Sequence, residues 1–208
     1  MSEQKKQVLA VANIKGGVGK TTTSLHLAKW LLIANPEKKL LFINASSQLG
    51  ANCWAKDLGI DYIQETNTEL MLSTIDNSNV DIVVIDLPGE SESVKDALDV
   101  CDRVLIPIQA STLDLTDTLS IIRIIKRKMT IRKDLGVGFF LSLVETNTTS
   151  FKQASEYFLK NKIKLLTPIS NLQIIRKAPQ YGKTVFDMGA SGKRAAQDYH
   201  KLFQEFTI

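Results

Sequence analysis

VANIKGGVGKTTTS, residues 11–24, is the most informative segment of this 208-residue chain. An apolar run enters a glycine-rich loop, and the loop leads into a segment that favours a helix. Glycines let backbone N–H groups converge on phosphate oxygens, and the N-terminus of the following helix adds a favourable partial charge. The stretch therefore predicts a phosphate-binding loop, with Lys20 on the β- and γ-phosphates and the hydroxyl of Thr21 on Mg²⁺.

Around this loop, short apolar runs alternate with helical patterns. Strands that read as buried on both faces, each followed by a helix, are typical of a parallel sheet covered on both sides, and such sheets bind ligands at the carboxyl ends of their strands. We expect an α/β fold with a mostly parallel, twisted sheet, organised as one domain over residues 1–208. The expected strands are 7–13, 39–44, 80–89, 103–109 and 137–144, with a candidate last strand at 163–166, and the expected helices are 20–34, 113–132, 149–161 and a terminal helix after GASGKR (189–194).

The composition excludes several classes of protein. Apolar residues make up 44% and charged residues 23%, as in ordinary globular proteins. No apolar run reaches the length that spans a membrane, and the opening MSEQKKQ lacks the apolar middle of a signal peptide. Cys53 and Cys101 show no metal-ligand spacing and favour a reducing compartment. We therefore expect a cytoplasmic protein with no membrane partner.

Charge is divided unevenly along the chain. Residues 1–119 hold 10 Lys and Arg against 16 Asp and Glu, whereas residues 120–208 hold 16 against 6. Such asymmetry is typical of a basic face that meets a polyanion, although solvated helix surfaces rich in lysine give the same pattern. The cluster RIIKRKMTIRK (123–133) reads first as a solvated helix face and second as a surface for DNA or a partner.

The loop departs from the common pattern G-x-x-x-x-G-K-[ST], because Ile14 stands where the first glycine belongs. The sequence KGGVGKTT (15–22) instead resembles the deviant Walker A box of the ParA/MinD group of P-loop ATPases. The resemblance extends from residue 8 to about residue 203. It implies the P-loop NTPase fold, the cofactors ATP and Mg²⁺, and a nucleotide-binding set of Lys15, Gly16, Gly17, Val18, Gly19, Lys20, Thr21 and Thr22.

Two further features follow from this resemblance. In that family the early lysine, matched by Lys15, reaches across a dimer interface to the phosphates of the ATP in the other subunit, so we expect a homodimer when ATP is bound. The run IVVIDLPG (82–89) matches the Walker B and switch region, which implies that Asp86 joins Thr21 in holding Mg²⁺. Pro88 and Gly89 would begin a loop that senses the γ-phosphate.

The second strand is followed by an unusual stretch. Family members usually carry D-x-D-P-Q there, and its second aspartate orients or activates the attacking water. This chain has Asn44-Ala45-Ser46-Ser47-Gln48. A serine hydroxyl cannot replace a carboxylate as general base near pH 7, although Ser46 or Gln48 can position a water. We expect slow hydrolysis by a catalytic set of Lys15, Lys20, Asp86 and Ser46, with Glu90 and Glu92 as compensating groups or, more simply, as helix caps.

The C-terminal third carries a second match to the family. RKAPQYGKTVF (176–186) resembles the late E-A-P-x-x-G-x-x-V stretch, with Lys177 in place of the glutamate. In small plasmid-type ParA proteins this region binds DNA without sequence preference, and a centromere-binding, ParB-like adaptor stimulates hydrolysis. The resemblance thus implies a nucleoid-associated partition ATPase, whose DNA-binding residues would be Arg176, Lys177, Lys183, Lys193 and Arg194. The base of ATP is expected near residues 167–173.

Several other functions remain open at this point. The absent aspartates also fit an ATP-gated, dimerising adaptor with little or no hydrolysis. A MinD-like positioning ATPase would need an amphipathic C-terminal helix, and the chain ends in KLFQEFTI. A dethiobiotin-synthetase-like ligase would need substrate residues in the switch loops. An iron–sulfur reductase on this scaffold would need Cys53 and Cys101 in the family's cysteine motifs, where neither lies.

Overall fold

Six parallel strands form the centre of the molecule in the computed structural model, in the order β3-β2-β4-β1-β5-β6. The structure describes residues 6–110 and 115–208. The carboxyl ends of all six strands meet at one edge of the sheet, as the sequence predicts. The strands are β1 (Gln7–Val11), β2 (Leu40–Asn44), β3 (Tyr62–Gln64), β4 (Ile82–Asp86), β5 (Arg103–Ile108) and β6 (Gly136–Leu141).

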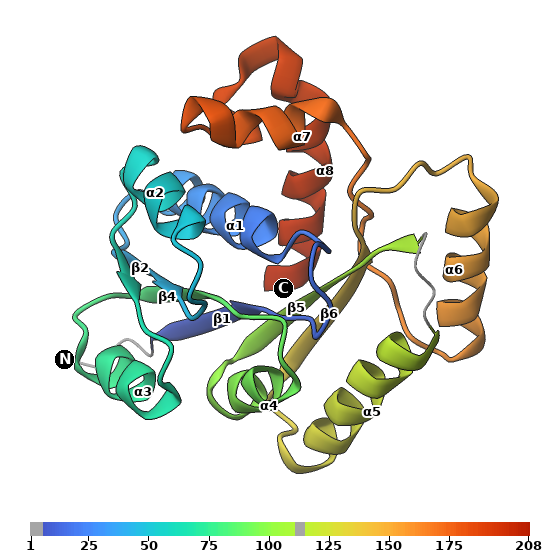
Figure 1. Cartoon of the computed structure of the whole chain (residues 1–208), viewed down its shortest axis with the longest axis horizontal. Coiled ribbons are helices and arrows are strands. Elements are labelled where there is room, and N and C mark those ends of the chain that lie inside the picture. Colours follow the sequence, from blue (N-terminus) through green and yellow to red (C-terminus); the bar gives the residue numbers. More distant parts are fainter. Residues whose placement is uncertain (1–5, 111–114) are drawn as a thin grey trace.

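Helices cover both faces of the sheet (Figure 1). One layer contains α1 (Lys20–Ala34), α2 (Gly50–Asp57), α7 (Gln173–Lys177) and α8 (Gly189–Thr207). The other contains α3 (Thr68–Asn77), α4 (Ser91–Val100), α5 (Leu115–Ile131) and α6 (Thr149–Lys160). Two short 3₁₀ turns, η2 (Ala178–Tyr181) and η3 (Val185–Asp187), join α7 to α8. Among the helices in the described ranges, none combines the length and apolar character that would cross a membrane.

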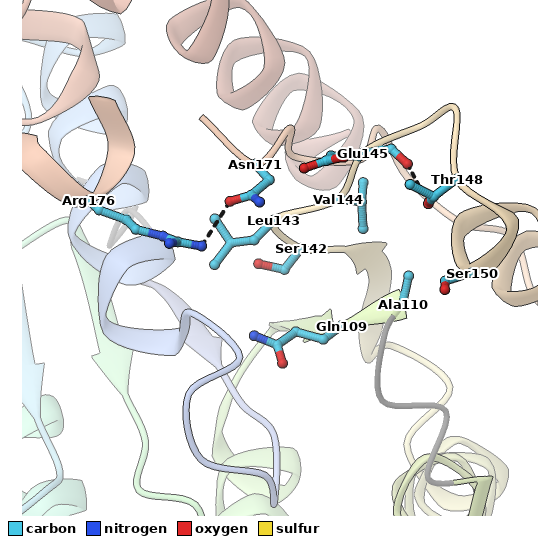
Figure 2. A pocket seen from close by; sticks show the side chains of 10 residues that line it. All are labelled: Gln109, Ala110, Ser142, Leu143, Val144, Glu145, Thr148, Ser150, Asn171 and Arg176. Carbon is cyan, nitrogen blue, oxygen red and sulfur yellow. Dashed lines mark hydrogen bonds between the residues drawn. The ribbon is translucent and has the colours of Figure 1, made fainter. Parts of the chain in front are cut away.

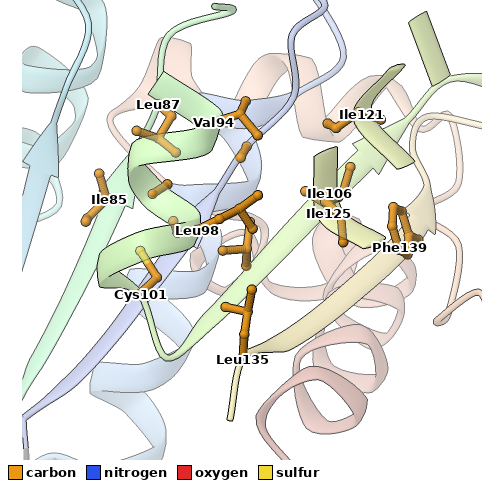
Figure 3. Close-up of a cluster of buried hydrophobic side chains, with 14 of the residues drawn as sticks. Ile85, Leu87, Val94, Leu98, Cys101, Ile106, Ile121, Ile125, Leu135 and Phe139 are labelled. Atoms are coloured by element: carbon orange, nitrogen blue, oxygen red, sulfur yellow. The ribbon is translucent and has the colours of Figure 1, made fainter. Parts of the chain in front are cut away.

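Alternation along each strand explains the continuous apolar runs of the sequence. In β1, Val8 and Ala10 face the layer of α3, α4 and α5, while Leu9 and Val11 face the layer of α1, α2 and α8. Figure 3 shows part of the first of these cores, with apolar side chains from β4, β5, β6, α4 and α5. Because both faces are buried, no polar face is needed, and the α/β prediction is confirmed.

The elements differ from the prediction in three places. Residues 163–166 form no strand, because the segment bonds to β6 and the residues after it only at isolated points, with single parallel bridges from Leu165 to Phe139 and from Ser170 to Val144. The terminal helix begins at Gly189, within GASGKR rather than after it. The helix expected over 113–132 runs from Leu115 to Ile131, and the start of the expected range lies outside the described residues. The strand β3, the helices α2, α3, α4 and α7, and the turns η2 and η3 were not predicted.

Candidate functional site

The phosphate loop lies between β1 and α1, at the carboxyl edge of the sheet (Figure 1). Its backbone is left-handed at Gly17 (φ 73°) and Gly19 (φ 92°), a conformation that residues with a Cβ rarely adopt. Val18 is buried, whereas Gly16 and Gly17 are exposed. The glycines therefore leave the loop backbone open to a ligand, and the buried valine anchors it to the core.

Two neighbouring polar side chains hold the shape of this loop. Gln109, directly after β5, donates from Nε2 to the carbonyl oxygen of Gly17 at 2.9 Å. Asn13 accepts from the N–H of Lys15 at 3.0 Å through Oδ1, and its Nδ2 donates to the carbonyl oxygen of Pro107 at 2.6 Å. The loop is thus tied to the neighbouring strand at two points, which keeps its conformation defined without a ligand.

The ammonium group of Lys20 is held by the loop itself. Its Nζ donates to the carbonyl oxygen of Lys15 at 2.8 Å. Burial lowers the pKa of Lys20, and the negative charge of Asp86 opposes that shift. A Cβ built on Gly89 would lie 3.5 Å from Nζ of Lys20 and 3.2 Å from the carbonyl oxygen of Ile14. The predicted switch loop therefore passes directly over the phosphate loop.

Thr21 and Asp86 meet as predicted. The hydroxyl of Thr21 donates to Oδ2 of Asp86 at 2.6 Å. Asp86 is 1% exposed, and its Oδ1 has no hydrogen-bond partner among the described residues. Burial raises the pKa of Asp86 to about 6, against the hydrogen bond from Thr21 and the charge of Lys20. A buried carboxylate with one oxygen unpartnered, beside a hydroxyl, fits a hard divalent cation such as Mg²⁺.

Residues 44–48, which contain no acid, lie on the same side of the site as Thr21 and Asp86. Asn44 ends β2, is fully buried and stands in register with Asp86 of β4. Beyond it, Ser46 and Gln48 share a cavity of about 360 Å³ with Thr21 and the indole of Trp54. The structure therefore places Ser46 in one cavity with Thr21, and residues 44–48 offer no carboxylate there.

Glu90 and Glu92 do not take over from the missing acid in this arrangement. Glu90 is the N-cap residue of α4, but its side chain makes no capping hydrogen bond, so the capping prediction is wrong for it. Glu92 is exposed and forms an ion pair with Lys95 on its own helix, with Nζ and Oε1 2.6 Å apart. Neither carboxylate is buried or held in the manner of Asp86.

A second cavity, of about 300 Å³, opens beside the phosphate loop (Figure 2). Gln109 and Ser142 lie on one side of it, and both touch the loop, because a Cβ on Gly19 would lie 3.2 Å from Oγ of Ser142. On the other side, Arg176 donates from Nη2 to Oδ1 of Asn171 at 2.9 Å. This cavity continues the phosphate site towards residues 167–173.

The five residues predicted to bind DNA are all exposed, but they do not all face the same way. Arg176 lines the cavity beside the phosphate loop and bonds to Asn171. Lys177 ends α7, Lys183 lies between η2 and η3, and Lys193 and Arg194 lie in the first turns of α8. Trp54 joins this stretch to α2, because its Nε1 donates to the carbonyl oxygen of Lys183 at 3.1 Å.

The two cysteines lie in different layers. Cys101 follows α4 and is fully buried in the core of Figure 3, where burial raises the pKa of its thiol. Cys53 is exposed on α2, on the other face of the sheet. The two thiols therefore do not form one cluster within this chain.

Sequence reasoning missed Asn13, Gln109, Ser142 and the other polar groups that shape the site. A signal for them was available. Each strand ends on a polar residue or is followed by one within two positions, namely Asn13, Asn44, Gln64, Asp86, Gln109 and Ser142. In a parallel sheet these positions share one edge, so polar residues after otherwise apolar strands indicate a common site.

A parallel sheet with a glycine-rich loop after β1, a lysine and a threonine opening α1 and a buried aspartate ending β4 defines a P-loop nucleotide-binding protein. The comparison with protein families agrees. Residues 9–185 match the model of the CobQ/CobB/MinD/ParA nucleotide binding domain, and the chain belongs to this family. The predicted membership of the ParA/MinD group is confirmed.

Two curated relatives carry the same name. The chain is 26% identical over 215 residues to the maintenance of carboxysome distribution protein A of Halothiobacillus neapolitanus, and this alignment covers 99% of the chain and 98% of the relative. It is 36% identical over 115 residues to the protein of that name from Gloeobacter kilaueensis, with 52% of each chain covered.

Solved structures show the same fold. One, from Borrelia burgdorferi B31 and described as a plasmid partition protein, is bound to AMPPNP; it has a TM-score of 0.74 at 18% identity and covers 97% of this chain and 99% of its own. Another is the septum site-determining protein MinD of Pyrococcus horikoshii with Mg-ADP, with a TM-score of 0.69 at 18% identity and coverage of 97% and 96%. The predicted cofactors, ATP and Mg²⁺, agree with these ligands.

Proposed function

We propose that this chain is an ATP-dependent positioning or partition ATPase that acts as one domain over residues 1–208. The observation that carries the proposal is the buried Asp86, with one oxygen unpartnered beside the Thr21 hydroxyl and behind an open phosphate loop. A carboxylate in that state costs stability unless a cation joins it. The family supplies the ligand class, and the loop supplies the site.

The roles of the residues follow from their positions. Lys20 exchanges the carbonyl oxygen of Lys15 for the β- and γ-phosphates, since both are acceptors within reach of one flexible side chain. Thr21 and Asp86 hold Mg²⁺, which neutralises phosphate charge when bound. The cavity of about 300 Å³ beside the loop takes the nucleoside, with Asn171 on its wall.

Dimerisation is the step by which bound ATP would be sensed. The backbone of Lys15 takes part in two hydrogen bonds of the loop, through its N–H and its carbonyl oxygen, and the residue is half-buried. A cation in this place is suited to the phosphates of a second subunit, as the family resemblance implies.

The test is the size of the protein with each nucleotide. With a non-hydrolysable ATP analogue and Mg²⁺ we expect a dimer by light scattering, and with ADP a monomer. Lys15→Ala should bind the analogue but remain monomeric, whereas Lys20→Ala should lose binding itself. A wild-type chain that stays monomeric in saturating analogue would contradict the proposal.

For the cargo, we propose a large assembly distributed along nonspecific DNA of the nucleoid, with a ParB-like adaptor as partner. Relatives are named for carboxysome distribution and for plasmid partition, so the cargo is a plasmid or a comparable body. Lys177, Lys183, Lys193 and Arg194 are the proposed DNA contacts. Arg176 is assigned to the nucleotide side instead, because it lines the cavity there.

An ATP-gated adaptor with little hydrolysis is the second candidate. One observation favours it, since the residues of 44–48 that line the cavity with Thr21 are the uncharged Ser46 and Gln48, and the carboxylate in that lining, Asp57, comes from α2. We expect phosphate release by the wild-type protein to be slow, and Ser46→Asp to raise it about tenfold or more, in line with general acid–base contributions. Adding DNA and the adaptor separates the candidates, because a partition ATPase is then stimulated. Wild-type turnover equal to that of aspartate-bearing relatives would exclude the adaptor.

A further inference from the structure

Three carboxamide side chains meet behind Ser46. They come from three different elements, namely Asn44 at the end of β2, Asn52 in α2 and Gln64 at the end of β3. Asn44 and Gln64 stand side by side in the parallel register of β2 and β3, and Asn52 reaches them from the helix above. Neither the catalytic set nor the nucleotide-binding set uses Asn52 or Gln64.

Their hydrogen bonds form a closed ring that runs in one direction. The N–H of Ser46 donates to Oδ1 of Asn44 at 3.0 Å, and Nδ2 of Asn44 donates to Oδ1 of Asn52 at 2.9 Å. Nδ2 of Asn52 then donates to Oε1 of Gln64 at 3.1 Å, and Nε2 of Gln64 donates to the carbonyl oxygen of Ser46 at 2.9 Å. Hydrogen bonds aligned in this way polarise one another.

The direction of the ring is fixed by the backbone. It begins at the N–H of Ser46 and ends at the carbonyl oxygen of the same residue, so no amide can reverse without placing donor against donor or acceptor against acceptor. The second proton on Nδ2 of Asn44 donates to the carbonyl oxygen of Gln48 at 2.8 Å, and the N–H of Gln48 donates to Oγ of Ser46 at 3.0 Å. Residues 46–48 are therefore held from both ends.

We propose that Asn44, Asn52 and Gln64 are positioning residues that hold residues 46–48 as a preformed wall on the γ-phosphate side of the nucleotide. This inference rests on the proposed function. Ser46 and Gln48 line the same cavity as Thr21, whose hydroxyl would hold the Mg²⁺ of a bound nucleotide. On this proposal the wall contacts the third phosphate and contributes to the preference for ATP over ADP.

The ring also explains why residue 44 is an asparagine. An aspartate at 44 would accept from the N–H of Ser46 but would donate neither to Asn52 nor to the carbonyl oxygen of Gln48. It would also place a second carboxylate in register with the buried Asp86. The uncharged ring holds residues 46–48 in place although residues 44–48 contain no aspartate.

The test uses substitutions outside the buried part of the ring. Asn52→Asp and Gln64→Glu keep the size of the side chain but remove the amide donor, and neither residue is buried. Asn77→Asp is the matched control, because Nδ2 of Asn77 donates only within α3, to Ser73. Hydrogen exchange of the amides of Ser46 and Gln48 is measured without nucleotide, and the Kd of ADP and of Mg²⁺-ATPγS by calorimetry.

We expect Asn52→Asp to speed exchange of both amides and to lower the ratio of ATPγS to ADP affinity, each about fivefold, with the Kd of ADP unchanged. Gln64→Glu should have a smaller effect, because water replaces an exposed donor, and Asn77→Asp should match the wild type. Unchanged amide exchange at Ser46 and Gln48, or an equal loss of affinity for ADP and ATPγS, would contradict the proposed wall. A wild-type chain that binds neither nucleotide would refute the proposed function and the wall with it, whereas normal binding with an unchanged ratio in Asn52→Asp would refute only the wall.

Discussion

Asp86 is the residue on which the metal site depends, and it is costly to the free protein. It is buried, one of its oxygens has no partner among the described residues, and burial raises the pKa of Asp86 from 3.8 to about 6. A carboxyl whose folded pKa lies above its unfolded value stabilises the fold below pH 3.8 and loses that contribution as the pH rises through 6. At neutral pH the charged form therefore opposes folding until a cation binds.

Removing the charge of Asp86 should change the stability of the fold and the binding of ATP in opposite directions. We expect Asp86→Asn to raise the free energy of unfolding of the nucleotide-free protein by about 1–3 kcal/mol at pH 7.5, because an amide needs no counter-charge. The same variant should lose Mg²⁺-dependent binding of ATP. Urea unfolding and calorimetry measure the two effects, and Asp61→Asn, at an exposed aspartate, is the control. A less stable Asp86→Asn protein would show that the carboxylate is structural.

At the scale of elements, His26 connects the helix that follows the phosphate loop to the C-terminal stretch. Its Nε2 accepts from the N–H of Val185 at 3.1 Å, so the proton is on Nδ1, which donates to the carbonyl oxygen of Thr22 at 2.6 Å. Its ring stacks on Tyr199 of α8, with centroids 4.4 Å apart. The sequence offered only an ordinary helix residue here, because Val185 is 159 positions away along the chain.

The buried imidazole predicts a pH dependence of stability. Burial lowers the pKa of His26 from 6.5 to about 4, so its contribution is complete above pH 6.5 and is lost as the pH falls towards 4. Between pH 7 and 4.5 the wild type should lose about 2–3 kcal/mol more unfolding free energy than His26→Gln. Asp86 titrates in the opposite direction but is present in both proteins and cancels in the difference. Parallel urea profiles for the two proteins would contradict this role.

The sequence predicted some elements well and others not at all, for physical reasons. β1, β2, β4, β5 and β6 are buried on both faces, so their apolar runs stand out. β3 is three residues long at the sheet edge, with two of them exposed, and leaves no such run. The phosphate loop was predictable because all its residues are consecutive. The role of Gln109 was not, because only the strand order brings it to Gly17. The bond from Asn13 to Pro107 and the bonds of Asn52 to Asn44 and Gln64 likewise join residues that only the fold brings together.

At the scale of the whole molecule, the excess positive charge of residues 120–208 is spread over α5 and the residues just after it, α6 and the segment after it, and the stretch from α7 to α8. Two of these helices carry an exposed Lys-Arg pair at adjacent positions. The pairs are Lys126 and Arg127 on α5, and Lys193 and Arg194 on α8. These two pairs are matched in composition and differ only in place. They therefore allow the proposed DNA surface to be tested against the basic cluster of α5.

Reversing the charge of one Lys-Arg pair at a time should show whether α5 or α8 contacts DNA. With the ATP analogue bound, we expect Lys193→Glu with Arg194→Glu to weaken binding to duplex DNA of arbitrary sequence at least tenfold and to reduce the slope of log K against log salt by about 2. Lys126→Glu with Arg127→Glu should leave both quantities near the wild type. Fluorescence anisotropy at several salt concentrations measures them, and the opposite ranking would move the surface to α5.

The position of Trp54 gives the protein a built-in optical reporter. Its indole is 7% exposed, shares a cavity with Thr21 and Ser46, and donates to the backbone of the basic stretch at Lys183. The only other tryptophan in the sequence, Trp30, lies on α1 next to His200. Replacing Trp30 by phenylalanine leaves a single emitter beside the site, so the filling and emptying of the pocket can be followed in real time on unlabelled protein.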